Sequence, residues 1–268
     1  MYQFIYHKPT SVAEAVGLFG EADDPMYLSG GMTLIPTMKQ RLAAPTDLID
    51  LSGISEMTGI TVSQGIIRIG AFTRHNDLAD SAEIANTLPV LAHLASLIGD
   101  NQVRNRGTIG GSVANSDPSA DYPAAVIGLG ATVYTQDRSI AGDDFFKDLF
   151  ETALRPGEVI THLEFPVPTR AAYKKFPNPA SRYAVVGVLI ADFAGTIRVG
   201  VTGAGPCAFR ASGIEKVLNE TLSVDAIESV EVPDAGFNTD LHASAEYRAH
   251  LVKVMAKRAL IDLLNNEG

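Results

Sequence analysis

A polar run with several glycines at residues 107–123 carries the residue types and spacing best suited to bind a ligand. Its paired glycines, Gly110 and Gly111, have no Cβ, so the backbone can approach a ligand closely and turn its N–H groups outward. Successive N–H groups of this kind form a nest that suits a phosphate. Short polar side chains in the same run could hydrogen-bond a nucleotide's phosphates and ribose: Thr108, Ser112, Asn115 and Asp121. A single glycine pair, taken alone, is more often a tight turn between packed elements.

A second glycine pair, Gly30-Gly31, follows a short apolar run at 26–28 and precedes helical sequence over 34–42. The order of strand, glycines, hydroxyl residue and helix places N–H groups at a helix N-terminus, where a phosphate binds. Neither loop has the Gly-Lys-Ser/Thr ending of a Walker A loop or the G-x-G-x-x-G spacing of a dinucleotide fold. Two such loops about 80 residues apart suit an extended diphosphate held from both sides, as in a flavin dinucleotide.

The elements that position these loops follow from hydrophobic periodicity and capping signals. A short opening strand, a helix over 11–20 with Ser11 as its cap, and strands at 26–28 and 47–51 predict a small β-α-β-α-β unit closed by about residue 55. From residue 56 the pattern changes. The predicted elements are a hairpin of 57–62 with 66–69, helical sequence to about 98, a helix over 122–130, and strands over 131–136 and 158–165.

The last hundred residues predict a different arrangement. Three strand-like runs with turn chemistry between them indicate an antiparallel sheet, at 171–176, 183–192 and 196–204. Helices are predicted over 211–219, 223–230 and 243–264. The fold class is therefore α/β followed by α+β. We expect a cofactor-binding domain over 1–170, with lobes of about 1–55 and 56–170, and a C-terminal domain over 171–268.

Composition excludes several classes of function. The 268-residue chain has a formal charge of −10 and no concentrated run of Lys or Arg, which argues against nucleic-acid binding. No apolar stretch approaches the ~20 residues that cross a bilayer, and no signal peptide is evident, so we expect a cytoplasmic protein. One cysteine, Cys207, cannot form an internal disulfide or hold an iron–sulfur cluster. The six histidines have no ligand spacing, so no metal site is expected.

Three residues have both a structural and a functional interpretation. Thr73 and His75 could act in chemistry, but polar residues at a helix start are more often caps. Asp121 is placed to cap the helix over 122–130, and it could also bind a ribose; one carboxylate could do both.

The ordered set of motifs resembles the medium, FAD-binding subunit of the molybdenum hydroxylases, the family of aerobic carbon monoxide dehydrogenase and xanthine dehydrogenase. Leu28-Ser29-Gly30-Gly31-Met32-Thr33-Leu34-Ile35-Pro36 resembles the family's A-G-G-x-x-L-P loop, and Thr108-Ile109-Gly110-Gly111 resembles its T-I-G-G loop. Asn115, Pro118, Asp121 and Pro123 continue the second match. Pro156-Gly157-Glu158-Val159-Ile160 and Tyr247-Arg248 also occur in similar places. The family often has Asn where this chain has Ser112.

The resemblance implies a role for each matching residue. The pyrophosphate would be wrapped by Leu28, Ser29, Gly30, Gly31, Met32, Thr33, Leu34 and Ile35, and Thr108, Ile109, Gly110 and Gly111 would complete that cradle, with Asn115 beside it. Asp121 would bind the ribose or adenine end. Ile98 and Ile160 would pack on the cofactor, Lys175 would lie near the flavin ring, and Tyr183 would lie beside the isoalloxazine.

The function implied is electron transfer in a multi-subunit complex. A large molybdopterin subunit would oxidise the substrate, a small subunit with [2Fe–2S] clusters would pass electrons on, and non-covalent FAD on this chain would deliver them to an external acceptor. The complex would be a dimer of heterotrimers. Two alternatives stay open: a stand-alone nucleotide-binding regulatory module, and an independent flavin oxidoreductase with covalent FAD. The covalent form needs a His or Cys at the loops, and 28–36 and 107–123 contain neither.

Overall fold

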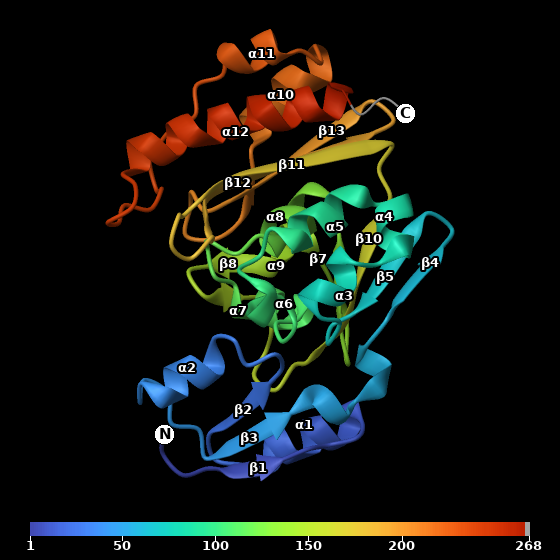
Figure 1. The fold of residues 1–268 in the computed structure, drawn as a ribbon, viewed down its shortest axis with the longest axis vertical. Helices are drawn as coiled ribbons and strands as arrows, with labels where there is room; N and C mark the ends of the chain where they lie inside the picture. The colour runs from blue at the N-terminus through green and yellow to red at the C-terminus, as the bar shows by residue number, and fades with distance from the viewer. Residues whose placement is uncertain (266–268) are drawn as a thin grey trace.

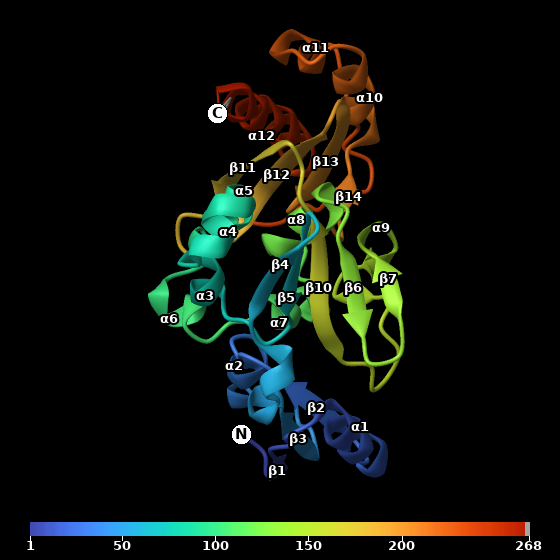
Figure 2. The ribbon, with the colours of Figure 1, turned by 90° about the vertical axis from the view of Figure 1, so that its right-hand side faces the viewer.

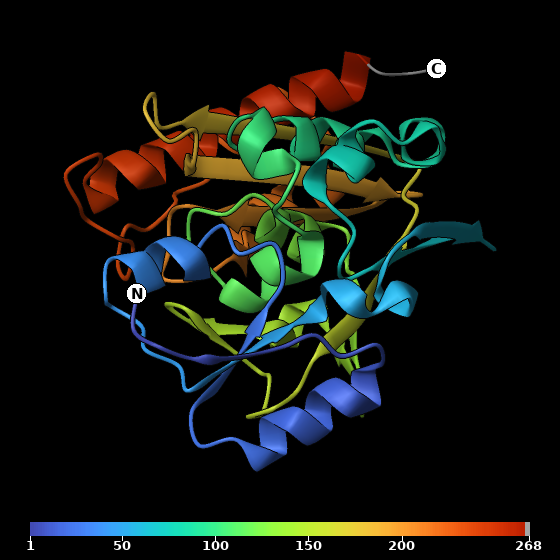
Figure 3. The ribbon, with the colours of Figure 1, turned by 60° about the horizontal axis from the view of Figure 1, so that its bottom comes forward.

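Three sheets and a two-stranded ribbon follow one another along the chain in the computed structural model, which describes residues 1–265 (Figure 1). The first lobe is a parallel sheet in the order β1-β3-β2, built from β1 Ile5–His7, β2 Pro25–Leu28 and β3 Asp47–Asp50. Its helices, α1 Val12–Glu21 and α2 Leu34–Lys39, lie on opposite faces of the sheet (Figure 3). Right-handed crossovers in opposite directions produce this arrangement. The predicted β-α-β-α-β unit is confirmed.

Local sequence accounts for the ends of α1. The Ser11 hydroxyl accepts a hydrogen bond from the Glu14 amide at 3.2 Å, as its capping position predicts. Two short 3₁₀ turns, Leu51–Gly53 and Ser55–Met57, then lead into the middle of the chain.

The middle of the chain is an antiparallel sheet in the order β4-β5-β10-β6-β7, which lies between the first lobe and the C-terminal sheet (Figure 2). Its strands are β4 Ile60–Ser63, β5 Ile66–Gly70, β6 Thr132–Thr135, β7 Ser139–Ala141 and β10 Ile160–Pro166. Gln64 and Gly65 both have positive φ, 50° and 76°, as a tight hairpin turn requires, so the predicted β4–β5 hairpin is confirmed.

Helices surround one side of this sheet, and several are shorter than the sequence indicated. They are α3 His75–Ala79, α4 Ala82–Thr87, α5 Pro89–Ser96, α6 Asn101–Arg104, α7 Ile109–Asn115, α8 Tyr122–Gly128 and α9 Gly142–Phe145. The ribbon is formed by β8 Phe146–Asp148 and β9 Glu151–Thr152. We had not predicted β7, α9 or the ribbon, because each is too short to show a hydrophobic period.

The C-terminal sheet has the order β11-β12-β13-β14, with bounds Arg170–Pro177, Ala184–Phe193, Thr196–Thr202 and Phe209–Arg210. The three predicted strands are confirmed, and the two-residue β14 is a fourth. Helices α10 Ser212–Glu220, α11 Val224–Glu228 and α12 Ala245–Asn265 cover its outer face (Figure 1).

Strand β12 joins the two large apolar cores. Successive side chains of a strand point to opposite faces. Accordingly, Val188 and Ile190 pack with α12, whereas Leu189 and Ala191 belong to the core of the middle sheet and its helices. The C-terminal sheet is thus buried on both faces, which fixes it rigidly against α8 and α5. No helix in residues 1–265 is both long and apolar enough to span a membrane.

Candidate functional site

A cleft of about 600 Å³ lies between the first lobe and the rest of the chain, and both glycine loops line it. Its wall contains fourteen of the predicted site residues: Ser29, Gly30, Gly31, Met32, Thr33, Leu34, Ile98, Thr108, Gly110, Gly111, Asn115, Asp121, Ile160 and Tyr183. Four others do not line it: Leu28, Ile35, Ile109 and Lys175. Sequence positions far apart are therefore brought together as the two-loop interpretation expects.

The three apolar residues that do not line the cleft pack in hydrophobic cores instead. Leu28 and Ile35 pack in a small cluster within the first lobe, and Ile109 is fully buried in the middle core. Leu28 ends strand β2, where successive side chains point to opposite faces, and Ile35 and Ile109 belong to helices, where side chains 3.6 residues apart share a face. These three residues shape the loops from behind.

The first loop presents free backbone donors. Gly31 has φ +74°, a left-handed conformation that the absence of a Cβ allows. Within residues 1–265, the amides of Gly30, Gly31, Met32 and Thr33 have no hydrogen-bond acceptor. This stretch forms the row of N–H groups that the sequence predicted for a phosphate.

The second loop differs from the prediction. Gly110 and Gly111 are helical residues of α7, and neither has positive φ. The amide of Gly110 donates to the carbonyl of Ala71 at 2.8 Å, and that of Gly111 to the Thr108 hydroxyl at 3.1 Å. These donors already have partners, so the expected outward-facing nest at 107–111 is wrong.

Glycine is needed in both loops because backbones approach closely. A Cβ on Gly30 would lie 2.2 Å from the carbonyl oxygen of Arg106, and one on Gly110 would lie 2.5 Å from the Cβ of Ala71. The Ser29 and Thr108 hydroxyls are 2.7 Å apart. The two loops therefore touch directly at the wall of the cleft, with a hydroxyl pair and bare backbone between them.

Asp121 occupies the N-cap position of α8, but its side chain caps nothing, so the capping interpretation is wrong. Its carboxylate accepts hydrogen bonds from the Tyr173 hydroxyl at 2.6 Å and from the Lys175 ammonium at 3.0 Å. Burial raises the pKa of this carboxyl, and Lys175 and Tyr173 oppose that rise. Asp121, expected at the ribose or adenine end of the cofactor, and Lys175, expected near the flavin ring, thus lie in direct contact.

The Lys175 ammonium donates its hydrogen bonds to acceptors within the protein. Besides Asp121, its ammonium donates to the carbonyls of Leu97 and Arg182, each at 2.8 Å. Three donors meet three acceptors, which is the full capacity of the group. Lys175 thus holds together the segment before Ile98, the start of α8 and the loop that carries Tyr183.

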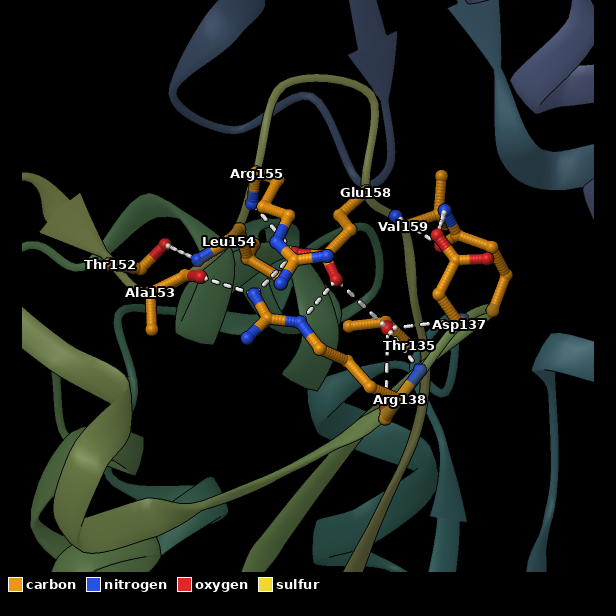
Figure 4. A network of polar contacts seen from close by, with 10 residues as sticks. Thr135, Asp137, Arg138, Thr152, Ala153, Leu154, Arg155, Glu158 and Val159 are labelled. Carbon is orange, nitrogen blue, oxygen red and sulfur yellow. Dashed lines mark hydrogen bonds and ion pairs between the residues drawn. The ribbon is translucent and has the colours of Figure 1, made fainter.

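An ion pair that the sequence did not reveal orders the wall around Ile160 (Figure 4). The Glu158 carboxylate, 7% exposed, accepts from Arg138 Nε at 2.7 Å and Nη2 at 2.8 Å, and from the Arg155 amide at 2.6 Å. The Arg138 hydrogen bonds lower the pKa of Glu158 to about 2. The sequence motif gives no sign of this pair, because Arg138 lies 20 positions before Glu158, in the turn between β6 and β7.

His75 is a cleft residue that the capping interpretation missed. It is the first residue of α3, only 4% exposed, and it lines the cleft beside Gly107. Its Nδ1 is buried without a hydrogen-bond partner in residues 1–265. Burial, with a smaller effect from Arg104, lowers the pKa of His75 to about 4. Thr73, by contrast, exchanges hydrogen bonds with the backbone of Gly59 and is structural.

These features fit a bound dinucleotide. The free amides of the first loop can donate to a ligand's phosphates, and Ile98, Leu154 and Ile160 supply an apolar wall for its rings. No cluster of His, Cys, Asp or Glu in residues 1–265 has the arrangement of a metal site. Fold and cleft together define a dinucleotide-binding protein with a preformed slot between its lobes.

Comparisons with known proteins show the family to which the chain belongs. Residues 2–168 match the family described as "FAD binding domain in molybdopterin dehydrogenase", and the chain belongs to this family. It is 35% identical to the carbon monoxide dehydrogenase medium chain of Hydrogenophaga pseudoflava, covering 96% of each chain. It is 32% identical to the glyceraldehyde dehydrogenase medium chain of Sulfolobus acidocaldarius, covering 96% of this chain and 97% of that one.

A solved structure has the same fold. The crystal structure of a cyanide-inactivated Cu,Mo-CO dehydrogenase contains a chain that superposes with a TM-score of 0.91, at 34% identity over 98% of both chains. The predicted resemblance is confirmed, and the protein is an FAD-binding oxidoreductase subunit of the molybdenum hydroxylase type.

Proposed function

We propose that this chain is the electron-transfer subunit of a heterotrimeric molybdenum hydroxylase. FAD, when bound, accepts electrons from a small [2Fe–2S] subunit and delivers them to an external acceptor, while a large molybdopterin subunit oxidises the substrate. The complex is proposed to be a dimer of such heterotrimers. The role of this chain's own residues is to bind, orient and shield the cofactor.

One observation carries the proposal: the two buried carboxylates of the cleft have ion-pair partners, and the third cleft carboxylate, half-buried Asp117, accepts a hydrogen bond from the Ser119 amide at 2.9 Å. Asp121 is paired with Lys175, and Glu158 is paired with Arg138. A general base for an organic substrate needs a free group with a pKa near the working pH. The imidazole of His75, whose pKa is lowered to about 4, is too weak a base for that task. The cleft is therefore suited to holding a cofactor, and reduction comes from outside the chain.

The site residues proposed for FAD differ from the sequence-based set in their roles. The free amides of Gly30, Gly31, Met32 and Thr33 bind the diphosphate, and Ile98, Ile160 and Tyr183 pack against the rings. Lys175 positions the wall and does not itself touch the cofactor. We place the end of the cofactor-binding domain near residue 170, between the last strand of the middle sheet and β11.

Anaerobic reduction tests the electron-transfer role. The purified chain loaded with FAD is mixed with candidate substrates while the flavin absorbance is followed, and the mixture is repeated after the two partner subunits are added. Bleaching is expected only with the partners. Rapid bleaching with the chain alone would identify a self-sufficient oxidoreductase and refute the proposal.

Covalent attachment is a second candidate because His75, which lies outside the two loop segments, also lines the cleft beside Gly107. We propose non-covalent FAD, because the loop segments 28–36 and 107–123 contain no His or Cys. Acid precipitation should release all the flavin into the supernatant. Yellow flavin left on the washed pellet would establish the covalent form.

A further inference from the structure

His75 stands at the junction of the two glycine loops. Its backbone amide donates to the carbonyl of Gly107 at 3.0 Å, which fixes the start of α3 to the second loop. Its ring packs against Tyr122, with ring centroids 5.3 Å apart and a tilt of 49°. The imidazole is thus held in one orientation by a backbone bond on one side and an aromatic ring on the other.

The burial of Nδ1 assigns the tautomer. A neutral imidazole has one N–H donor and one acceptor nitrogen. Nδ1 is buried without a partner, and buried N–H groups without an acceptor are rarer than buried acceptors without a donor. We therefore assign the hydrogen to Nε2. Burial and the nearby Arg104 guanidinium lower the pKa of His75 to about 4, so the ring is neutral at pH 7.

Nε2 borders the place where the two loops meet. A Cβ on Gly107 would lie 2.4 Å from Nε2, so the absence of a side chain there leaves room for this nitrogen at the cleft wall. The Cα of Gly107 is in turn 2.7 Å from where a Cβ on Gly30 would be. Gly30 begins the row of free amides. Nε2 and the first of those amides are therefore both neighbours of Gly107 at the cleft wall.

We propose that His75 binds the diphosphate of FAD by donating its Nε2 hydrogen to a phosphate oxygen. The proposal rests on FAD binding by this chain. Since the amides of Gly110 and Gly111 are already used within the protein, His75 supplies the donor on the side of the second loop. A neutral donor binds phosphate without placing an uncompensated positive charge in the wall when the cofactor is absent.

Two substitutions of His75 distinguish the role of Nε2 from that of Nδ1. His75→Gln can place an amide N–H where Nε2 lies, whereas His75→Asn reaches only the position of Nδ1. The full chain, wild type and variants, is titrated with FAD and with riboflavin, which lacks the diphosphate. His75→Asn should weaken FAD binding roughly tenfold or more and leave riboflavin binding unchanged, and His75→Gln should recover most of the loss.

The outcomes separate this proposal from the parent function. If the wild-type chain binds no FAD, both fail. If it binds FAD but His75→Asn binds it equally well, or loses FAD and riboflavin affinity alike, the diphosphate contact is refuted. If His75→Asn does not fold, ¹⁵N NMR of the wild type decides. The protonated Nε2 resonance should shift with FAD and stay in place with riboflavin, and no shift with FAD would overturn the proposal.

Discussion

The ammonium of Lys175 lies 3.0 Å from the carboxylate of Asp121, and the two side chains are only 5% and 4% exposed. Removing one partner of such a buried pair leaves the other charged and desolvated, which costs more than the pair itself contributes. The Tyr173 hydroxyl supplies a further bond to the same carboxylate at 2.6 Å. The pair joins β11 to the start of α8 at the cleft wall.

Lys175→Met should lower the free energy of unfolding by about 3 kcal/mol, because it strands the Asp121 carboxylate and frees two backbone carbonyls. Asp121→Asn should cost less, since an amide oxygen can still accept from Tyr173 and Lys175. Urea unfolding of both single variants and the double variant measures the coupling. The double variant should lose less than the sum of the singles; strict additivity would mean that the pair is not coupled.

Stability should rise with pH between about 4 and 6.5 because of His75. The pKa of His75 is about 4 in the folded chain, below its ordinary value of 6.5, so the unfolded chain binds the extra proton in this window. The contribution present at pH 7, about 3 kcal/mol, is lost as the pH falls through the window. Urea unfolding at several pH values should show this slope in the wild type and its absence in His75→Asn. Equal slopes would refute it.

The Arg138–Glu158 pair should matter at lower pH. Arg138 holds the pKa of Glu158 at about 2, below its ordinary value, so its stabilisation is present at neutral pH and is lost as the pH falls from about 4.5 to 2. Arg138→Met should lower the free energy of unfolding at pH 7, because the buried Glu158 carboxylate loses its ion-pair partner.

The matched control for that variant is Arg155→Met. It removes an exposed side chain three residues before Glu158 and keeps the Arg155 amide that donates to the Glu158 carboxylate. Urea unfolding at pH 7 and at pH 3 compares the two. The Arg138 variant should show less acid sensitivity than the wild type, and the Arg155 variant should match the wild type at both pH values. A loss of stability in Arg155→Met as large as in Arg138→Met would contradict the ion-pair account.

Gly110→Ala should destabilise the chain even without FAD, by about 1–3 kcal/mol, because the new Cβ would lie 2.5 Å from the Cβ of Ala71 and 2.7 Å from its carbonyl oxygen. Gly17→Ala is the control, since that helical glycine of α1 has nothing within 4 Å and should gain up to about 1 kcal/mol. Thermal unfolding of the flavin-free proteins measures both. Unchanged stability in Gly110→Ala would refute the packing role.

The sequence predicted the parts of this protein whose signals are local. The cap at Ser11, the hairpin turn at Gln64-Gly65 and the period of α12 each depend on residues within a few positions, and each is confirmed. The first glycine loop was found for the same reason, because β2, the glycines and α2 follow one another directly in the chain.

The chemistry of the cleft depended on distant partners and was less predictable. Whether the Gly110 amide is free depends on Ala71, and the role of Asp121 depends on Lys175, which lies 54 positions further along the chain. His75 has the same residue type whether it caps a helix or lines a wall, and only burial and its neighbour Gly107 distinguish the two. Hydrogen-bond partners of this kind are set by tertiary structure.

The contact between Gly30 and the second loop limits how far the cleft can close. Because bare backbone already meets bare backbone there, and the Ser29 and Thr108 hydroxyls are 2.7 Å apart, the first lobe cannot swing further inward around a ligand. The width of the slot at this contact is therefore set by the backbone of the two loops and does not depend on a side chain that could rotate away.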